Sequence, residues 1–187
     1  HQALAVTAMP AFMKRLANLD GSSALALRFL VLTASRSGEV RGARWSEIDF
    51  EQVVWTIPPE RMKARREHRV PLTSAALKVL EEVQSKSGPA RSDLIFCNLR
   101  GEMLSDMSLT AMMRRMDLEA VPHGFRSTFR DWVGESTEYP SDLAEMALAH
   151  VLPNKTEAAY RRGDALEKRR GMMDAWALQC LPAKPHG

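Results

Sequence analysis

The fold of this 187-residue chain is decided around the stretch Thr33-Ala34-Ser35-Arg36-Ser37-Gly38-Glu39-Val40. Residues 24–33, which lead into it, are apolar on nearly all sides and predict a buried central helix. Arg36 follows that helix and precedes the break at Ser37-Gly38, so its charge needs an anionic partner or water, because an unpaired buried charge is costly. From this stretch alone, both an ion pair with Glu39 and a role in binding an external anion are open for Arg36.

Working outward, the sequence predicts more helices around the central one and a single patch of strands. The β-forming residues at 48 and 53–57 end at Pro58-Pro59, and a second short run follows at 69–72. These runs predict an antiparallel sheet of two or three strands with a basic turn at 61–66. We therefore expect an α+β, mainly helical fold. The expected helices are 9–19, 24–33, 39–44, 73–86, 108–116, 124–135, 142–150 and 165–181.

Length and composition limit the class of protein. The chain is 45% hydrophobic and 26% charged, which is ordinary for a globular domain of this size. Its longest apolar run, 24–32, is interrupted by Arg28 and is far shorter than the ~20 residues of a membrane span. Cys97 and Cys180 lack CxxC spacing and fit reduced thiols in a cytoplasmic protein. We expect no membrane partner, and a flexible tail at 182–187.

The cationic residues are mostly arginine, with 19 Arg against 7 Lys, although the formal net charge is only +3. The planar guanidinium grips phosphate oxygens in a bidentate fork, whereas the lysine ammonium is a point charge. The excess of arginine is thus compatible with a phosphate-containing partner. An arginine-rich chain can also be simply soluble, so composition alone leaves both open.

Three further segments hold side chains suited to phosphate chemistry. They are the basic run 61–69, the stretch His123-Gly124-Phe125-Arg126 at a helix start, and residues 148–163, which include His150 and Tyr160. Each has an ordinary alternative when taken alone: a solvated hairpin tip, a helix cap and a packing tyrosine. With Arg36 from the first stretch, they supply the set of Arg36, Lys63, His123, Arg126, His150 and Tyr160: two Arg, two His, one Lys and one Tyr.

This combination is what metal-free transfer of a phosphodiester requires. A side chain must act as nucleophile, because no group of carboxylates in the sequence is arranged to hold Mg²⁺. Guanidinium groups can stabilise the added negative charge of the transition state, and a lysine can protonate the leaving oxygen. We therefore expect no metal and no other cofactor.

The same residues, in the same order, resemble the catalytic domain of tyrosine recombinases, in particular P4-like prophage and genomic-island integrases. The resemblance extends over roughly residues 9–181. Residues 33–40 are similar to the first-arginine box of that family, and His123-Gly124-Phe125-Arg126 to its His-x-x-Arg box. Lys63, which precedes His68-Arg69-Val70-Pro71-Leu72, matches the β-hairpin lysine. His150 matches the third basic position and Tyr160 the nucleophile.

The resemblance implies a site-specific DNA strand transferase that needs neither ATP nor a metal. Tyr160 would form a 3′-phosphotyrosyl bond, with Lys63 as general acid for the 5′-oxygen. His123 would assist Tyr160 as base or hold the phosphate. The phosphate would be held by Arg36, Arg126 and His150, with Glu39 orienting the active-site bases. Further DNA contacts are expected from Arg65, Arg66, Arg69, Arg161 and Arg162, although ion pairs with Glu157 or Asp164 are as plausible for the last two.

It also implies partners and a domain arrangement. Residues 1–187 would form a single C-terminal catalytic domain, with the arm-binding and core-binding domains outside this sequence. The partners would be double-stranded attachment sites, three further protomers in a synaptic tetramer, and accessory DNA-bending or directionality factors, in the bacterial cytoplasm at the nucleoid. Packing of the last helix on its own chain or on a neighbouring protomer is open. Two other functions are also open: a non-catalytic DNA-binding module with this fold, and a type IB topoisomerase.

Overall fold

The computed structural model describes residues 2–87, 92–153 and 163–183, and it confirms an α+β fold that is mainly helical. The helices are α1 (Met9–Ala17), α2 (Ser22–Thr33), α3 (Ser37–Arg41), α4 (Ser74–Lys86), α5 (Ser108–Arg115), α6 (Gly124–Ser136), α7 (Ser141–Ala147) and α9 (Leu166–Cys180). The 3₁₀ turns are η1 (Val6–Ala8), η2 (Trp45–Glu47) and η3 (Pro59–Arg61), and the strands are β1 (Ile48–Asp49), β2 (Val54–Ile57) and β3 (His68–Pro71).

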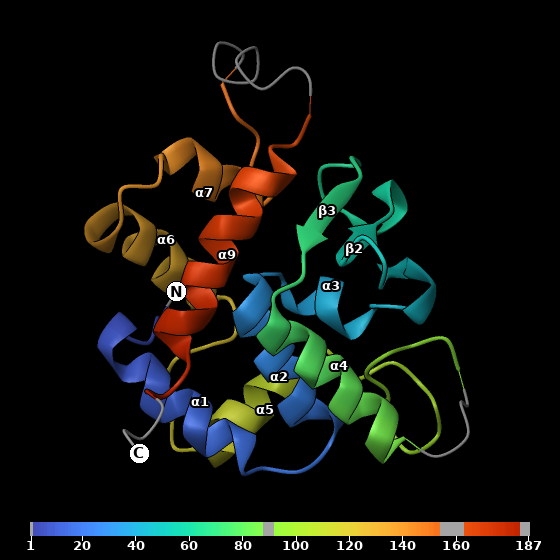
Figure 1. Ribbon diagram of the computed structural model, residues 1–187. Coiled ribbons are helices and arrows are strands. Elements are labelled where there is room, and N and C mark those ends of the chain that lie inside the picture. Colours follow the sequence, from blue (N-terminus) through green and yellow to red (C-terminus); the bar gives the residue numbers. More distant parts are fainter. Residues whose placement is uncertain (1, 88–91, 154–162, 184–187) are drawn as a thin grey trace.

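Helix α2 forms the centre of the molecule, as its all-round apolar sequence predicts. Nine of its 12 residues are buried, and it packs against α1, α4, α5 and α9 (Figure 1). The polar residues before it supply no side-chain cap. Gly21, at φ 101°, occupies the N-cap position without a side-chain hydrogen bond. Burial of its apolar surface, rather than a cap, therefore stabilises this helix.

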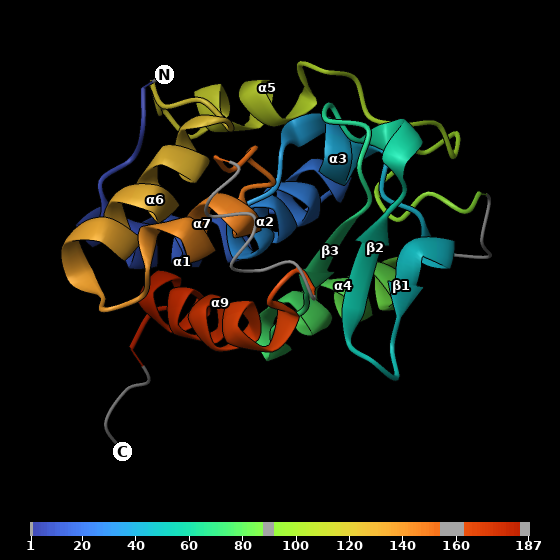
Figure 2. The same ribbon diagram turned by 90° about the horizontal axis from the view of Figure 1, so that it is seen from above.

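The three strands form an antiparallel sheet in the order β1-β2-β3, in agreement with the sequence prediction. Thr56 pairs with Arg69 and Ile57 with His68. The sheet lies at one side of the molecule, and β3 runs beside α9 (Figures 1 and 2). Because side chains alternate between the faces of a strand, His68 and Arg69 point in opposite directions from β3.

Helix α9 packs against its own chain. Met172, Met173 and Trp176 are buried, and the Trp176 Nε1–H donates to the carbonyl oxygen of Val31 in α2 at 2.8 Å. The same helix contacts α1, α7 and β3. Its buried stripe also includes Arg169, which the apolar pattern does not predict.

Two expected boundaries were wrong in ways that matter for the site. The helix expected over 142–150 ends at Ala147, so His150 lies outside it, and Ala149 has a left-handed backbone at φ 52°. The helix expected from Glu39 begins earlier, at Ser37. Both differences lie next to candidate site residues, because His150 follows α7 and Arg36 precedes α3.

No helix in the described ranges is both long and apolar enough to cross a membrane.

Candidate active site

Arg36 stands immediately before α3, at a turn created by the end of α2. Ala34 is left-handed at φ 51°, and the N–H groups of Ala34 and Ser35 donate to the carbonyls of Val31 and Leu30. These are the two bonds of a Schellman C-cap. The Arg36 backbone N–H and its Nη1 each donate to Glu39, both at 2.9 Å. The ion pair considered from the sequence is therefore present, and buried Glu39 orients Arg36 from behind.

Arg126 comes from α6 and is buried, although no carboxylate among the described residues lies at hydrogen-bond distance from it. Its Nη1 donates to the carbonyl of Ala34 at 2.8 Å and its Nη2 to the carbonyl of Leu148 at 2.6 Å. Burial and the charge of Arg36 lower the pKa of Arg126 to about 10, so it stays charged at neutral pH. Its guanidinium thus joins the end of α2 to the end of α7, and its Nε has no partner among the described residues.

His150 is held by the same kind of helix end. The His150 N–H donates to the carbonyl of Glu145 and the Ala149 N–H to that of Met146, again the pattern of a Schellman cap. This turn folds the imidazole back onto α7, where Nδ1 lies 2.5 Å from Glu145 Oε2. Its Nε2 lies 3.1 Å from Arg126 Nη2. Since arginine N–H groups can only donate, His150 Nε2 accepts a hydrogen bond from Arg126, and His150 Nδ1–H donates one to Glu145.

His123 is the exposed residue that precedes α6. Partial burial and the charges of Arg126 and Arg36 lower its pKa, so it is neutral at pH 7 and able to accept a proton. His150 also contributes to this lowering. Four of the expected site residues, from three different parts of the chain, are therefore close enough to influence one another electrostatically.

The hairpin loop that carries Lys63 is anchored at its start. Arg61 makes a bidentate ion pair with Glu47 through Nε and Nη2, at 2.8 and 2.7 Å, and its Nη1 donates to the carbonyl of Glu39 at 3.2 Å. These bonds attach the hairpin loop to α3, the helix that carries Glu39, the ion-pair partner of Arg36. Lys63 itself is exposed, as are Arg65 and Arg66.

Other expected site residues have different positions. Arg69, expected to contact DNA, makes a bidentate ion pair with Asp164, at 2.6 and 2.8 Å. Asp164 was considered as a partner for Arg161 or Arg162, not for Arg69. Tyr160, with Arg161 and Arg162, lies outside the described residues.

Three site residues were missed by the sequence analysis: Glu145, His68 and Arg169. His68 is buried, and burial together with the charges of Arg169, Arg126 and Arg36 lowers its pKa to about 3, against a hydrogen bond to the backbone of Ala147. In the sequence, His68 stands out only as the first residue of the motif that follows Lys63. Its spacing of two residues from Val70, which puts both on the same face of the strand, was the available signal for its burial. Glu145 gave none, because a spacing of five residues from His150 is not a helical neighbour spacing.

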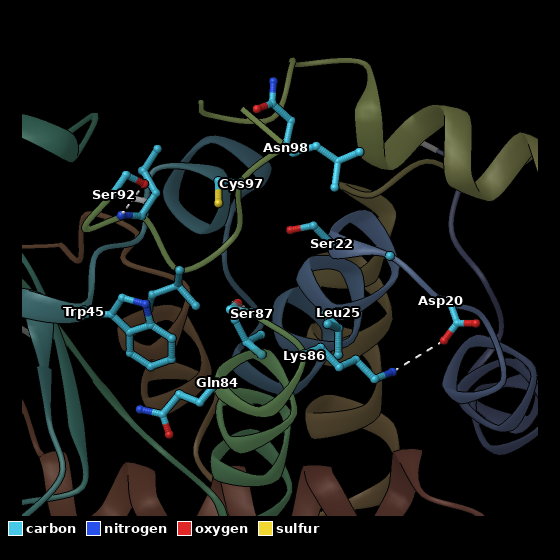
Figure 3. A pocket seen from close by; sticks show the side chains of 15 residues that line it. Asp20, Ser22, Leu25, Trp45, Gln84, Lys86, Ser87, Ser92, Cys97 and Asn98 are labelled. Carbon is cyan, nitrogen blue, oxygen red and sulfur yellow. Dashed lines mark hydrogen bonds and ion pairs between the residues drawn. The ribbon is translucent and has the colours of Figure 1, made fainter. Parts of the chain in front are cut away.

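A cavity of about 590 Å³ lies elsewhere, between the start of α2, the end of α4 and residues 92–99 (Figure 3). Trp45, Leu25 and Cys97 contribute to its wall, and Lys86 pairs with Asp20 at its edge, at 3.5 Å. None of the expected catalytic residues lines it. The candidate site is instead the cluster of Arg36, His123, Arg126 and His150. In the described part of the chain, no group of three or more His, Cys, Asp or Glu side chains could hold a metal ion.

Solved structures share this fold. The site-specific recombinase XerH bound to difH superposes with a TM-score of 0.63 at 17% identity, covering 85% of this chain and 52% of XerH. A lambda integrase tetramer bound to a Holliday junction gives a TM-score of 0.60 at 18% identity, covering 82% of this chain and 48% of that chain. At such low identity the likeness concerns the fold.

Sequence comparisons are more specific. Prophage integrase IntA of Escherichia coli K12 is 37% identical over 166 residues, which cover 87% of this chain and 40% of IntA. The integrase of Enterobacteria phage P4 is 33% identical over 198 residues, covering 95% of this chain and 45% of that protein. The chain therefore spans less than half the length of these curated relatives. The model of the phage integrase family matches residues 2–167, and the chain belongs to that family.

Proposed function

We propose that this chain cleaves and rejoins DNA strands as a site-specific recombinase, through a covalent bond between Tyr160 and a 3′-phosphate. The observation that carries the proposal is the cluster of Arg36, Arg126, His123 and His150, which interact electrostatically although the residues are up to 114 positions apart in sequence. Membership of the phage integrase family supports the same activity, as do the structural neighbours XerH bound to difH and lambda integrase bound to a Holliday junction.

The proposed reaction exchanges one phosphodiester for another. The Tyr160 Oη attacks the phosphorus, its proton passes to neutral His123, and the bond from phosphorus to the 5′-oxygen breaks. Lys63 gives the 5′-oxygen a proton, so a 5′-hydroxyl and a 3′-phosphotyrosyl ester result. Attack by the 5′-hydroxyl of another strand reverses these steps and releases Tyr160. The bond energy is conserved, so ATP is not needed, and the arginines would supply the positive charge that a metal supplies in other phosphoryl-transfer enzymes.

The cations stabilise the charge that develops on the phosphate. Arg36 and Arg126 are held in position by Glu39 and by two backbone carbonyls before any DNA arrives, so little reorganisation is required at the transition state. Arg126 still has its Nε–H to offer. To hold the same phosphate, His150 would donate from Nε2 as an imidazolium, with its Nδ1–H still bonded to Glu145.

The partners that follow are double-stranded attachment sites and other copies of the protein. The lambda integrase neighbour is a tetramer on a Holliday junction, which is the arrangement expected for exchange between two duplexes. Exposed Arg65 and Arg66, together with Arg161 and Arg162, are proposed to contact the DNA backbone, whereas Arg69 is paired with Asp164. Accessory DNA-bending or directionality factors, and action at the nucleoid in the bacterial cytoplasm, belong to the same proposal.

A covalent-trapping assay tests the proposal. The chain is incubated in EDTA with nicked duplexes that cover the junctions between its genomic element and the flanking DNA, and the products are separated on a denaturing gel. We expect a protein–DNA adduct that disappears in Tyr160→Phe and persists in Tyr139→Phe, a matched control at the other tyrosine of the chain. No adduct at protein concentrations that saturate the DNA, or an adduct retained in Tyr160→Phe, would overturn the proposal. Relaxation of a supercoiled plasmid without strand exchange would indicate a topoisomerase.

A further inference from the structure

A buried arginine fastens the start of α9 to the sheet. Arg169 is almost fully buried, and its Nη2 donates to the backbone carbonyl of Arg69 in β3 at 2.6 Å. Its Nη1 donates to the backbone carbonyl of Asp164 at 3.3 Å and lies 3.7 Å from the Asp164 carboxylate. One guanidinium therefore holds the main chain on both sides of this contact.

The side chains of Arg69 and Asp164 close the same contact. Arg69 Nε and Nη2 donate to the two carboxylate oxygens at 2.8 and 2.6 Å, which is the fork geometry of a bidentate pair. This pair raises the pKa of Arg69, and Arg69 and Arg169 lower the pKa of Asp164 against the effect of its burial. Arg69, Asp164 and Arg169 are called the clasp below.

The clasp joins the two segments from which reacting groups would come. Asp164 follows Tyr160 by four residues, a length of chain that spans at most about 14 Å. Arg69 follows Lys63 by six residues, on the strand to which the lysine loop leads. The neighbouring residue on that strand, His68, interacts electrostatically with Arg126 and Arg36, so β3 also borders the cation cluster.

This arrangement assigns Arg69 a role other than the expected DNA contact. The Nε and Nη2 edge that would grip a phosphate is occupied by Asp164. A phosphate would have to displace a carboxylate that is itself held by Arg169. Arg69 is therefore better placed to hold Asp164, just before α9, than to bind DNA.

Building on the proposed function, we propose that the clasp is a positioning device: it fixes Asp164, four residues after Tyr160, on β3 and so limits where Tyr160 can lie for attack on the phosphate. Arg69 and Asp164 are positioning residues, and opening the clasp lowers the rate of the chemical step without weakening DNA binding. Asp164→Asn removes the charge with almost no change in volume. Glu167→Gln is the matched control, because it makes the same change three residues later, in an exposed pair with Arg170.

Two measurements test the clasp. The first is the rate of adduct formation at saturating protein, with the DNA dissociation constant measured separately. We expect Asp164→Asn and Arg69→Gln each to lower the rate about tenfold with affinity changed less than about twofold, because a misplaced nucleophile loses near-attack geometry. The double variant should be no slower than either single variant, since the two residues act through one contact. Glu167→Gln should match the wild type.

The second measurement needs no DNA chemistry. Trypsin can cut after Lys155, Arg161 and Arg162, and mass spectrometry gives the initial rate of cleavage there. We expect this rate to rise about fivefold or more in Asp164→Asn, because local opening becomes easier, with the melting temperature of the whole chain little changed. Glu167→Gln again serves as the control.

The outcomes separate the two proposals. An unchanged tryptic rate in Asp164→Asn overturns the clasp whether or not the chain cleaves DNA. A loss of DNA affinity and a shallower salt dependence in Arg69→Gln, without these effects in Asp164→Asn, would also overturn it, because Arg69 would then be a phosphate contact. A raised tryptic rate in a protein whose wild type forms no adduct supports the anchoring contact and overturns the proposed function.

Discussion

Arg126 illustrates how one side chain can serve structure and chemistry together. A buried guanidinium is expensive to desolvate unless its N–H groups find acceptors. The acceptors here are the carbonyls of Ala34 and Leu148, each freed at a helix end by a left-handed residue. Carbonyls satisfy the hydrogen bonds without cancelling the charge. Arg126 therefore keeps a full positive charge directed at the site, where a carboxylate partner would have weakened its attraction for phosphate.

Glu145 provides the first prediction at the scale of a residue. Its carboxylate accepts from His150 Nδ1, which fixes the tautomer whose Nε2 faces Arg126. We expect Glu145→Ala to slow adduct formation about tenfold, because the imidazole loses its orientation. We expect Glu145→Gln to keep most of the rate, since the amide oxygen can accept the same bond. Rates at saturating protein check both variants.

The control for Glu145 is Glu135→Ala, which removes an exposed carboxylate from the neighbouring helix α6. Long-range ¹H–¹⁵N spectra report the tautomer of His150 directly, whatever the rate of the reaction. Equal tautomer populations in the wild type and Glu145→Ala would contradict the role given to Glu145, as would equal rates of adduct formation.

At the scale of elements, Gly124 allows the N-terminal segment to pack against the start of α6. The backbone of residues 2–3 crosses the start of this helix so closely that a Cβ on Gly124 would lie 2.3 Å from the carbonyl oxygen of Gln2. The Thr128 hydroxyl donates to the carbonyl of Leu4 at 2.6 Å and holds the crossing segment in place. We expect Gly124→Ala to destabilise the fold by about 1–3 kcal/mol, as overpacking does. For a chain of this length, that is roughly 3–10 °C in melting temperature.

The same helix offers a matched control for that substitution. A Cβ at Gly134 would meet no atom within 4 Å. Gly134→Ala should therefore stabilise the chain by about 0.5–1 kcal/mol, because alanine loses less backbone entropy in a helix. Thermal unfolding of both variants gives opposite signs if the crossing of residues 2–3 is the cause. A stabilised or unchanged Gly124→Ala would show that the N-terminal segment does not pack there in solution.

Comparison of the elements with the sequence shows which features were predictable. Helix α2 was predictable because its run of consecutive apolar residues indicates burial on all sides. The end of α7 was not, because Ala149 adopts a left-handed backbone without being glycine or asparagine. The burial of Arg169 was also hidden, since its acceptors are contributed by β3 and by the segment before α9.

For the whole molecule, the sequence identified the side chains and the local pair Arg36–Glu39, but not the long-range contacts that join them. The order of Arg36, Lys63, His123, Arg126 and His150 was visible because family motifs are local. The contact of Arg126 with Ala34 connects residues 92 positions apart, and that of Arg69 with Asp164 connects residues 95 apart. Such contacts depend on how α6, β3 and α9 pack around α2. Arg69 was therefore expected to face DNA, whereas the fold pairs it within the chain.

His68 gives a prediction for the stability of the whole molecule, because it links the sheet to the end of α7. Its pKa is lowered to about 3 in the folded chain by burial and by Arg169, Arg126 and Arg36, whereas the unfolded chain keeps the ordinary value near 6.5. Below about pH 6.5 the unfolded state binds a proton at His68, whereas the folded state binds one there only at about pH 3. The contribution of His68 to stability is thus complete above about pH 6.5 and is lost as the pH falls toward about 3.

The measurement is the free energy of unfolding by urea at a series of pH values. Between about pH 7 and pH 5, where the carboxylates remain largely ionised, the His68 contribution should fall by about 2 kcal/mol. His68→Gln can still donate to the Ala147 backbone but cannot titrate, so its stability should fall less over this interval by about that amount. The difference between the two proteins isolates His68, because His123, whose pKa is also lowered, titrates in both. Parallel pH profiles for wild type and variant would mean that His68 is not buried in its neutral form.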